Sequence, residues 1–231
     1  MVESPAINRE NYLVFTAYTM DKDVYEKAPV VSGSDLPPVK RPTDSAGDFS
    51  GCYANLKSRS KSVIMPAWCD FSITWNGNVE VQADREEFKY DIHNDPSYQL
   101  TDGEVVKLIS PWMVNTSKPE VEWVSAKSLH NKRAMSIPSG ITAWDESLMM
   151  WPIFVYIPRV LEYQLQVEMN HPLMSFYPIS DLPIHVETYL DPQKCYDLYA
   201  KQLEAIHGRK FASFYLDRKH NEKKTCPQNV S

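Results

Sequence analysis

The sequence has little glycine and lacks the short motifs that mark the common enzyme classes. Only seven of its 231 residues are glycine, whereas seventeen are proline. It contains no G-x-S-x-G, H-E-x-x-H, P-loop or G-x-G-x-x-G pattern, so it carries no usual signature of a serine hydrolase, zinc protease or nucleotide-binding protein. Because proline removes backbone donors and interrupts helices, this balance favours short strands and ordered loops over long helical bundles.

Cysteine pairs, long apolar segments and a recognisable leader are also missing. The four cysteines contain no C-x-x-C pair, which argues against a zinc ribbon or thioredoxin-like site and favours free thiols. The longest apolar run, LMMWPIFVYIP at 148–158, is shorter than the roughly 20 residues that span a bilayer. The opening residues, MVESPAINRENY, lack the basic and apolar regions of a signal peptide. We therefore expect a protein without a membrane partner that is not secreted by a signal peptide.

Charge is unevenly distributed along the chain. The formal net charge is −6, but residues 207–231 carry six Lys/Arg and two acidic residues, which leaves +4 there and −10 elsewhere. An acidic body argues against binding of a phosphate backbone, which requires clustered positive charge. The sequence therefore argues against a nucleic-acid partner except through the basic tail, and a solvated basic terminus is the simpler interpretation of that tail.

Hydrophobic residues make up 43% of the chain, enough to bury a full core in one domain. Residues 1–31 read as a strand and a helical turn that belong to this domain. A proline-rich arm at 32–48 follows, then a β-rich core at 49–208 that contains a late helix at 191–207, and finally a basic tail at 209–231.

Two stretches give the clearest strand signals. Residues 62–90 contain two strand-like runs separated at Asn76-Gly77, a pair typical of a β-hairpin turn. Residues 161–169 alternate strictly, with apolar side chains on one face and Glu or Gln on the other. Together with several further short apolar runs, these features predict a mainly β fold. We expect a single, mostly antiparallel sandwich, jelly roll or distorted barrel with one C-terminal α-helix.

The predicted helix begins at Asp191, a good N-cap, and Pro192 suits its first turn. Apolar residues recur at helical spacing, and we expect Leu198, Tyr199 and Leu203 to pack on the sheet. The tryptophans near expected strand ends are interpreted as core residues, in preference to a carbohydrate or nucleobase platform.

One triplet suggests metal chemistry. His93 and Asp95 form the His-x-Asp pattern of non-haem Fe(II) oxygenases, which also need a second histidine, and His171 or His185 could supply it. An enzyme of this kind would use Fe(II) and 2-oxoglutarate. The segment DIHNDPSY also reads as a turn, in which Asp95 bonds local backbone amides. We favour the turn, and so expect no catalytic residue, metal or cofactor.

Several motifs occur together in a recognisable order. They are a P-x-W-x-D motif at Pro66, Trp68 and Asp70, an S-P-W motif at Ser110, Pro111 and Trp112, and a late proline stretch at Pro172, Leu173 and Pro178. Over roughly residues 12–190 this pattern resembles an uncharacterised family of T4-like tailed phages of marine bacteria. The resemblance assigns no activity. It implies a phage origin, and hence a location in the host cytoplasm or the virion.

These observations lead to a functional prediction. We expect a non-enzymatic structural or binding protein of a tailed bacteriophage, either a virion component or an assembly partner, whose contacts are phage or host proteins or further copies of itself. The alternatives are an Fe(II)/2-oxoglutarate oxygenase-like jelly-roll enzyme and an inhibitor of a host protein. The arm at 32–48 and the tail at 209–231 are the expected partner-binding segments, because both are polar and poorly able to order themselves.

Overall fold

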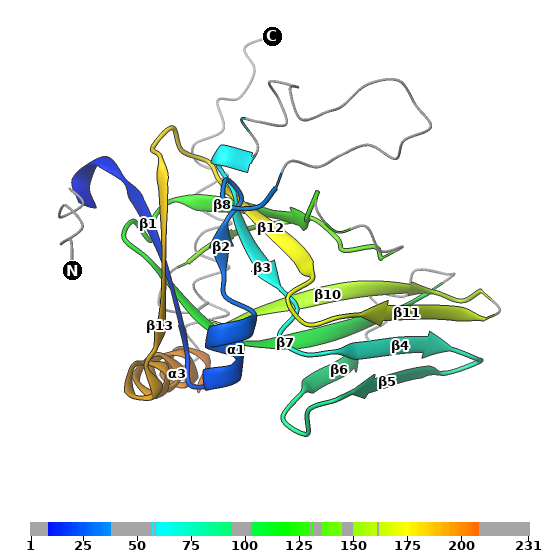
Figure 1. Cartoon of the computed structure of the whole chain (residues 1–231). Coiled ribbons are helices and arrows are strands. Elements are labelled where there is room, and N and C mark those ends of the chain that lie inside the picture. The colour runs from blue at the N-terminus through cyan, green and yellow to red at the C-terminus, as the bar shows by residue number, and fades with distance from the viewer. Residues whose placement is uncertain are drawn as a thin grey trace, which may run out of the picture.

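Short strands joined by turns form most of the chain in the computed structural model, which describes residues 9–37, 57, 59–93, 103–129, 131, 135–144, 150–160 and 162–207. The described strands form three sheets, and a helix follows the last strand (Figure 1). This confirms the predicted mainly β fold with a C-terminal helix. A 3-10 turn, η1 (Arg9–Asn11), precedes the first strand, and a short helix, α1 (Lys22–Lys27), follows it.

The first sheet has five strands and joins the two ends of the described chain. Its order is β10-β7-β1-β13, with β6 paired to β7 beside β1. The strands are β1 (Leu13–Thr19), β6 (Lys89–His93), β7 (Gly103–Thr116), β10 (Met150–Pro158) and β13 (Ile184–Leu190). The strands β1 and β13 run parallel, and the other pairs of this sheet are antiparallel.

The other two sheets are antiparallel throughout. One has three strands, with β4 (Phe71–Trp75) between β5 (Val79–Ala83) and β11 (Tyr163–Val167). The other has the order β2-β3-β12-β8-β9. Its strands are β2 (Val31–Ser32), β3 (Val63–Pro66), β8 (Glu122–Lys127), β9 (Gly140–Ala143) and β12 (Pro172–Pro178).

The predicted hairpin at Asn76-Gly77 is confirmed. Trp75 pairs with Val79, and the N–H of Asn76 donates to the carbonyl of Asn78 at 3.3 Å. Gly77 has a φ of +105°, which side-chain-bearing residues rarely adopt, so glycine permits the turn.

The alternating stretch at 161–169 forms β11, although the strand is shorter than predicted. Leu165 and Val167 are buried on one face and Gln164 is exposed on the other, as the alternation indicates. Glu162 precedes the strand with a φ of 62°, and Asn170 follows it with a φ of 66°. Both residues are in the left-handed region, Glu162 directly before the strand and Asn170 in the turn after it.

The core lies between the first sheet and the sheet that contains β8 and β12. Phe15 of β1 contacts Trp123 of β8 at 5.3 Å between ring centroids, and Trp144 at 5.7 Å. Phe176 of β12 completes this cluster, 6.2 Å from Phe15 and 5.3 Å from Trp144. All four rings are almost fully buried. The interpretation of the tryptophans as core residues holds for these positions, where aromatic packing across the sheets stabilises the sandwich-like arrangement.

The predicted helix is α3 (Pro192–His207), and its N-cap is Asp191, whose Oδ1 accepts from the N–H of Lys194 at 2.9 Å. Cys195 and Leu198 are buried against the sheet. The prediction for Tyr199 is wrong, because its side chain is 45% exposed. With 3.6 residues per turn, Cys195 and Leu198 define the inward face, and Tyr199 lies on its flank.

The expected arm and tail lie largely outside the described residues. The arm begins as β2, whose Ser32 pairs with Val63, and the N–H of Gly33 donates to the carbonyl of Ser62 at 2.8 Å. Residues 38–48 and 209–231 are not described. Within the described ranges, no helix is both long and apolar enough to cross a membrane.

Candidate functional site

A polar cleft of about 330 Å³ lies on the outer face of the first sheet, the face opposite the aromatic core. Its floor is formed by β7, β1 and β13, and α3 packs on the same face through Leu198, which contacts the cluster containing Met113 and Tyr18. Most of the lining side chains carry hydroxyl, amide or carboxylate groups. The cleft is lined by Val14, Thr16, Tyr18, Asn115, Thr116, Ser117, Glu187, Tyr189 and Asp191.

Strand register places the lining residues in rows across the floor. Thr16 is opposite Asn115 on one side and Glu187 on the other, so an amide, a hydroxyl and a carboxylate lie in line. In the next row, Tyr18 is opposite Tyr189, and their rings stack at 5.7 Å with an interplanar angle of 22°. Since successive residues of a strand point to opposite faces, this arrangement leaves Phe15 and Ala17 for the core.

Glu187 lies at the centre of a polar row along β13. Its Oε2 accepts a hydrogen bond from the hydroxyl of Tyr189 at 3.3 Å, and its Oε1 lies 3.6 Å from Nε2 of His185. The ring of His185 is in edge contact with that of Tyr12, with centroids 6.4 Å apart. His185, Glu187 and Tyr189 are spaced by two on β13 and share its outer face. The row presents a carboxylate between two groups that can donate hydrogen bonds.

Exposed tyrosines occur in the segments that build this face, and Tyr189 among them lines the cleft. Tyr12 is 36% exposed and Tyr189 is 43% exposed. On α3, Tyr196 and Tyr199 are 60% and 45% exposed. Tyrosine is enriched at protein interfaces because its ring supplies apolar contact area and its hydroxyl supplies a hydrogen bond. The surface therefore has the composition of a binding face.

No family model, curated protein or solved structure matches this chain. The interpretation of the site thus depends on the residues and their geometry.

The histidines of the suggested iron site lie in different regions of the described chain. His93 is opposite Val105 near the start of β7, and Asp95 lies outside the described residues. His185 is opposite Val14, which lies beside the far end of β7. At about 3.3 Å per residue, the eleven steps from Val105 to Thr116 put the two histidines near opposite ends of a strand segment with a length on the order of 30 Å. His93 and His185 therefore cannot bind one ion together.

His171 takes part in a structural hydrogen-bond network. Its Nε2 lies 3.1 Å from Oδ1 of Asn131, and the Nδ2 of Asn131 donates to the carbonyl of Leu173 at 3.3 Å. The backbone of His171 also accepts from the N–H of Ala67 at 2.8 Å. Among the described side chains, no group of three His, Cys, Asp or Glu residues is placed to hold a metal ion.

The P-x-W-x-D motif joins β3 and β4 to the start of β12. Pro66 is the last residue of β3 and is opposite Pro172. Trp68 is 4% exposed and stacks on Phe88 at 5.8 Å. The Oδ1 of Asp70 accepts from the N–H of Met169 at 2.6 Å, which fixes the turn before β12. All three motif side chains thus have structural roles.

The S-P-W motif is a bulge in the middle of β7. On one edge of β7, β6 pairs up to Ile109 and β1 pairs from Met113, so residues 110–112 lie between two partner strands. On the other edge, the register with β10 shifts at the same place. Pro111 has no N–H to contribute to a ladder, which suits a position between partners. The Oγ of Ser110 accepts from the N–H of Trp112 at 3.2 Å, and the Trp112 ring is fully buried.

The late proline stretch lies on β12. Leu173 is fully buried, and its carbonyl accepts from the N–H of Ser128 at 3.0 Å. Pro178, the last residue of β12, is opposite Trp123. The residues that carry the family resemblance are therefore core, turn and bulge residues, and none of them lines the cleft.

Both described thiols are buried. Burial raises the pKa of Cys69 to about 12, and the negative charge of Asp84 contributes to this rise. Burial, and secondarily the charge of Asp191, raise the pKa of Cys195 to about 11. At neutral pH these thiols are protonated and serve as apolar core groups.

The cleft was not predicted from the sequence. The alternation of His185, Glu187 and Tyr189 in IHVETYL is a visible signal that these side chains share one strand face. Thr16 and Asn115 join them only through pairing between segments far apart in the chain.

Proposed function

We propose that the chain is a non-enzymatic binding protein of a tailed phage, a virion component or assembly partner that contacts a phage or host protein through the outer face of the first sheet. The observation that carries this proposal is the cleft with its exposed tyrosines. Tyr189 combines 43% exposure with a hydroxyl bonded to Glu187, so the ring is available for contact while the hydroxyl is held in position.

The engagement of other reactive groups supports binding over catalysis. Asp70 accepts a backbone hydrogen bond from Met169, His171 is within hydrogen-bonding distance of Asn131, and the thiol of Cys69 is buried with a raised pKa. Each of these groups has a contact that accounts for it within the fold. The phage assignment follows from the sequence resemblance, and the binding role follows from the surface.

Site-specific photo-crosslinking in phage-infected cells would test this proposal. A photoreactive phenylalanine analogue at Tyr189 should give covalent adducts with a phage or host protein. The same analogue at Gln82, which is exposed on β5 in another sheet, is the matched control. Adducts found equally at both positions, or at neither, would contradict binding through the cleft. Mass spectrometry of purified particles then distinguishes a packaged protein from one that acts on the host.

A further inference from the structure

The strand β13 is a long, regular edge of the first sheet. All seven of its residues pair with β1, and within the described chain it has no other strand partner. It contains no proline between Ile184 and Leu190. The opposite edge strand, β10, contains Pro152 and Pro158 and is bridged by Ser136. Because an edge with unpaired N–H and C=O groups is a template for another strand, β13 is better suited to pairing than β10.

The direction of its backbone groups restricts how β13 can pair. The N–H of Leu13 donates to the carbonyl of Pro183 at 2.9 Å, and the N–H of Asp191 donates to the carbonyl of Thr19 at 3.0 Å. Odd-numbered residues of this segment therefore point their backbone groups at β1. Since direction alternates along a strand, Ile184, Val186 and Thr188 point theirs outward.

We propose that the chain forms a two-fold dimer in which β13 pairs antiparallel with β13 of a second copy, about an axis at Val186. This places Val186 opposite Val186 of the second copy, as a hydrogen-bonded pair. His185 then lies opposite Glu187 of the second copy, and the symmetry repeats that pairing on the other side of the axis. This inference does not depend on the proposed function.

The pairing of His185 with Glu187 favours this register over those centred on Glu187 and Thr188. An axis at Glu187 would place two carboxylates directly opposite each other, which is destabilising. An axis at Thr188 would place Glu187 opposite Tyr189 and leave His185 beyond the end of the second copy's strand. The axis at Val186 gives two complementary pairs in non-hydrogen-bonded positions, where opposed Cα atoms are only about 4.5 Å apart and side chains are closest.

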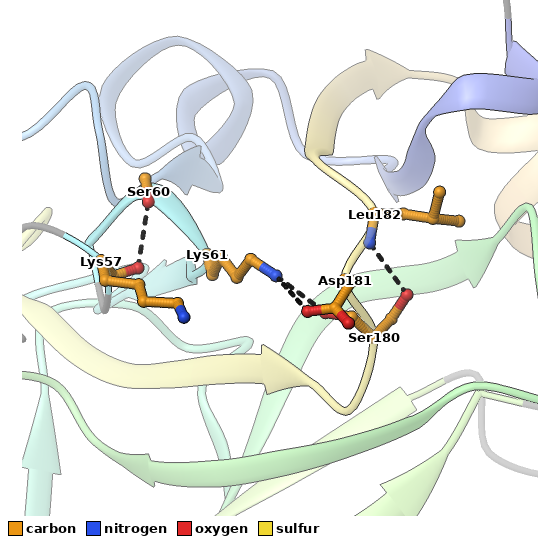
Figure 2. Close-up of polar contacts among 6 residues, drawn as sticks. All are labelled: Lys57, Ser60, Lys61, Ser180, Asp181 and Leu182. Atoms are coloured by element: carbon orange, nitrogen blue, oxygen red, sulfur yellow. Dashed lines mark hydrogen bonds and ion pairs between the residues drawn. The ribbon is translucent and has the colours of Figure 1, made fainter.

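Residues 180–182, which lead into β13, are held by contacts within a single copy of the chain. Figure 2 shows Lys61, whose Nζ donates to the carbonyl of Ser180 at 3.1 Å and lies 3.3 Å from Oδ1 of Asp181. The Oγ of Ser180 accepts from the N–H of Leu182 at 3.2 Å. A strand held at its entry loses little conformational entropy when it pairs. The dimer would join two five-stranded sheets into one, with both clefts on the same face.

Cysteine cross-linking tests the register. Cys69 and Cys195 are buried, so the other two cysteines, Cys52 and Cys226, are first changed to serine in the full chain. In this background Val186→Cys should form a disulfide-linked dimer under mild oxidation, because the paired Cα atoms would be about 5.5 Å apart. Glu187→Cys and Thr188→Cys are the controls, since strand spacings place their symmetry mates roughly 8 Å and 14 Å apart. Preferred linkage at either control position would overturn the axis at Val186, and no linkage at any position would overturn the dimer.

A charge swap tests the interface without cysteine. His185→Glu introduces two like-charged pairs and should raise the dimer dissociation constant by about tenfold in sedimentation velocity. The double change His185→Glu with Glu187→His restores both His–Glu pairs and should restore the wild-type value. Far-UV circular dichroism confirms that each variant is folded. Wild-type protein that stays monomeric, a single variant that dimerises normally, or a folded double variant that is not rescued would each contradict the proposal.

Discussion

Removal of the Leu198 side chain tests how α3 is attached to the sheet. Leu198 is 3% exposed and packs with Cys195 against Met113 and Tyr18. Leu198→Ala deletes three carbons, and at about 0.8 kcal/mol per buried carbon the transfer cost is about 2.4 kcal/mol. A residual cavity adds to this cost, although a helix on a sheet surface can partly collapse, so we expect a loss of about 2.5–3.5 kcal/mol in the free energy of unfolding.

Tyr199→Ala is the matched control, because its side chain is 45% exposed and its removal should cost about 0.5 kcal/mol or less. Urea unfolding followed by circular dichroism and tryptophan fluorescence gives both values, and hydrogen exchange of the α3 amides detects local detachment of the helix. Equal losses for the two variants would refute the assigned inward face. So would a Leu198→Ala variant with unchanged stability and unchanged protection of α3.

Two further predictions concern residues within the fold. Asp70→Ala should lower the unfolding free energy by about 0.5–1.5 kcal/mol, because the exposed N–H of Met169 exchanges its carboxylate acceptor for water, and Asp70→Asn, which keeps an oxygen, should lose less in the same urea titration. The raised pKa of Cys69 means that its protonated thiol stabilises the folded state below about pH 9, the ordinary thiol value, and that this contribution is lost as pH rises toward about 12. Stability measured across this range should fall less steeply in Cys69→Ala, and an identical slope would count against the assignment.

The elements predicted correctly are those that local chemistry determines. Asn76-Gly77 specifies a tight turn, the alternation around Leu165 specifies a strand, and Asp191 caps a helix, each through interactions within a few residues. Tyr199 was misassigned because a helical stripe several residues wide does not show which of its positions meets the sheet.

The candidate site could not be predicted from local sequence, because its residues meet only through the pairing of distant strands. Thr16, Asn115 and Glu187 come from three distant segments, and only the register of β7, β1 and β13 places them in one row. The sequence motifs, such as Ser110 to Trp112, mark backbone irregularities that maintain the fold. The unusual sequence motifs therefore correspond to structural features, whereas the cleft is formed by β1, β7 and β13, whose sequences are typical of strands.

The parallel pairing of β1 with β13 imposes an order on folding during synthesis. Leu13 lies opposite Ile184, so the two strands are separated by 171 positions in the chain. A contact of this sequence separation carries a high loop-closure cost, and it cannot form until the last strand has left the ribosome. Until then β1 lacks one of its two neighbours, although its inward residues Leu13 and Phe15 are fully buried in the finished protein. A nascent chain that stops before residue 184 would therefore leave β1 and its apolar residues incompletely covered. In this state the chain is a substrate for chaperones.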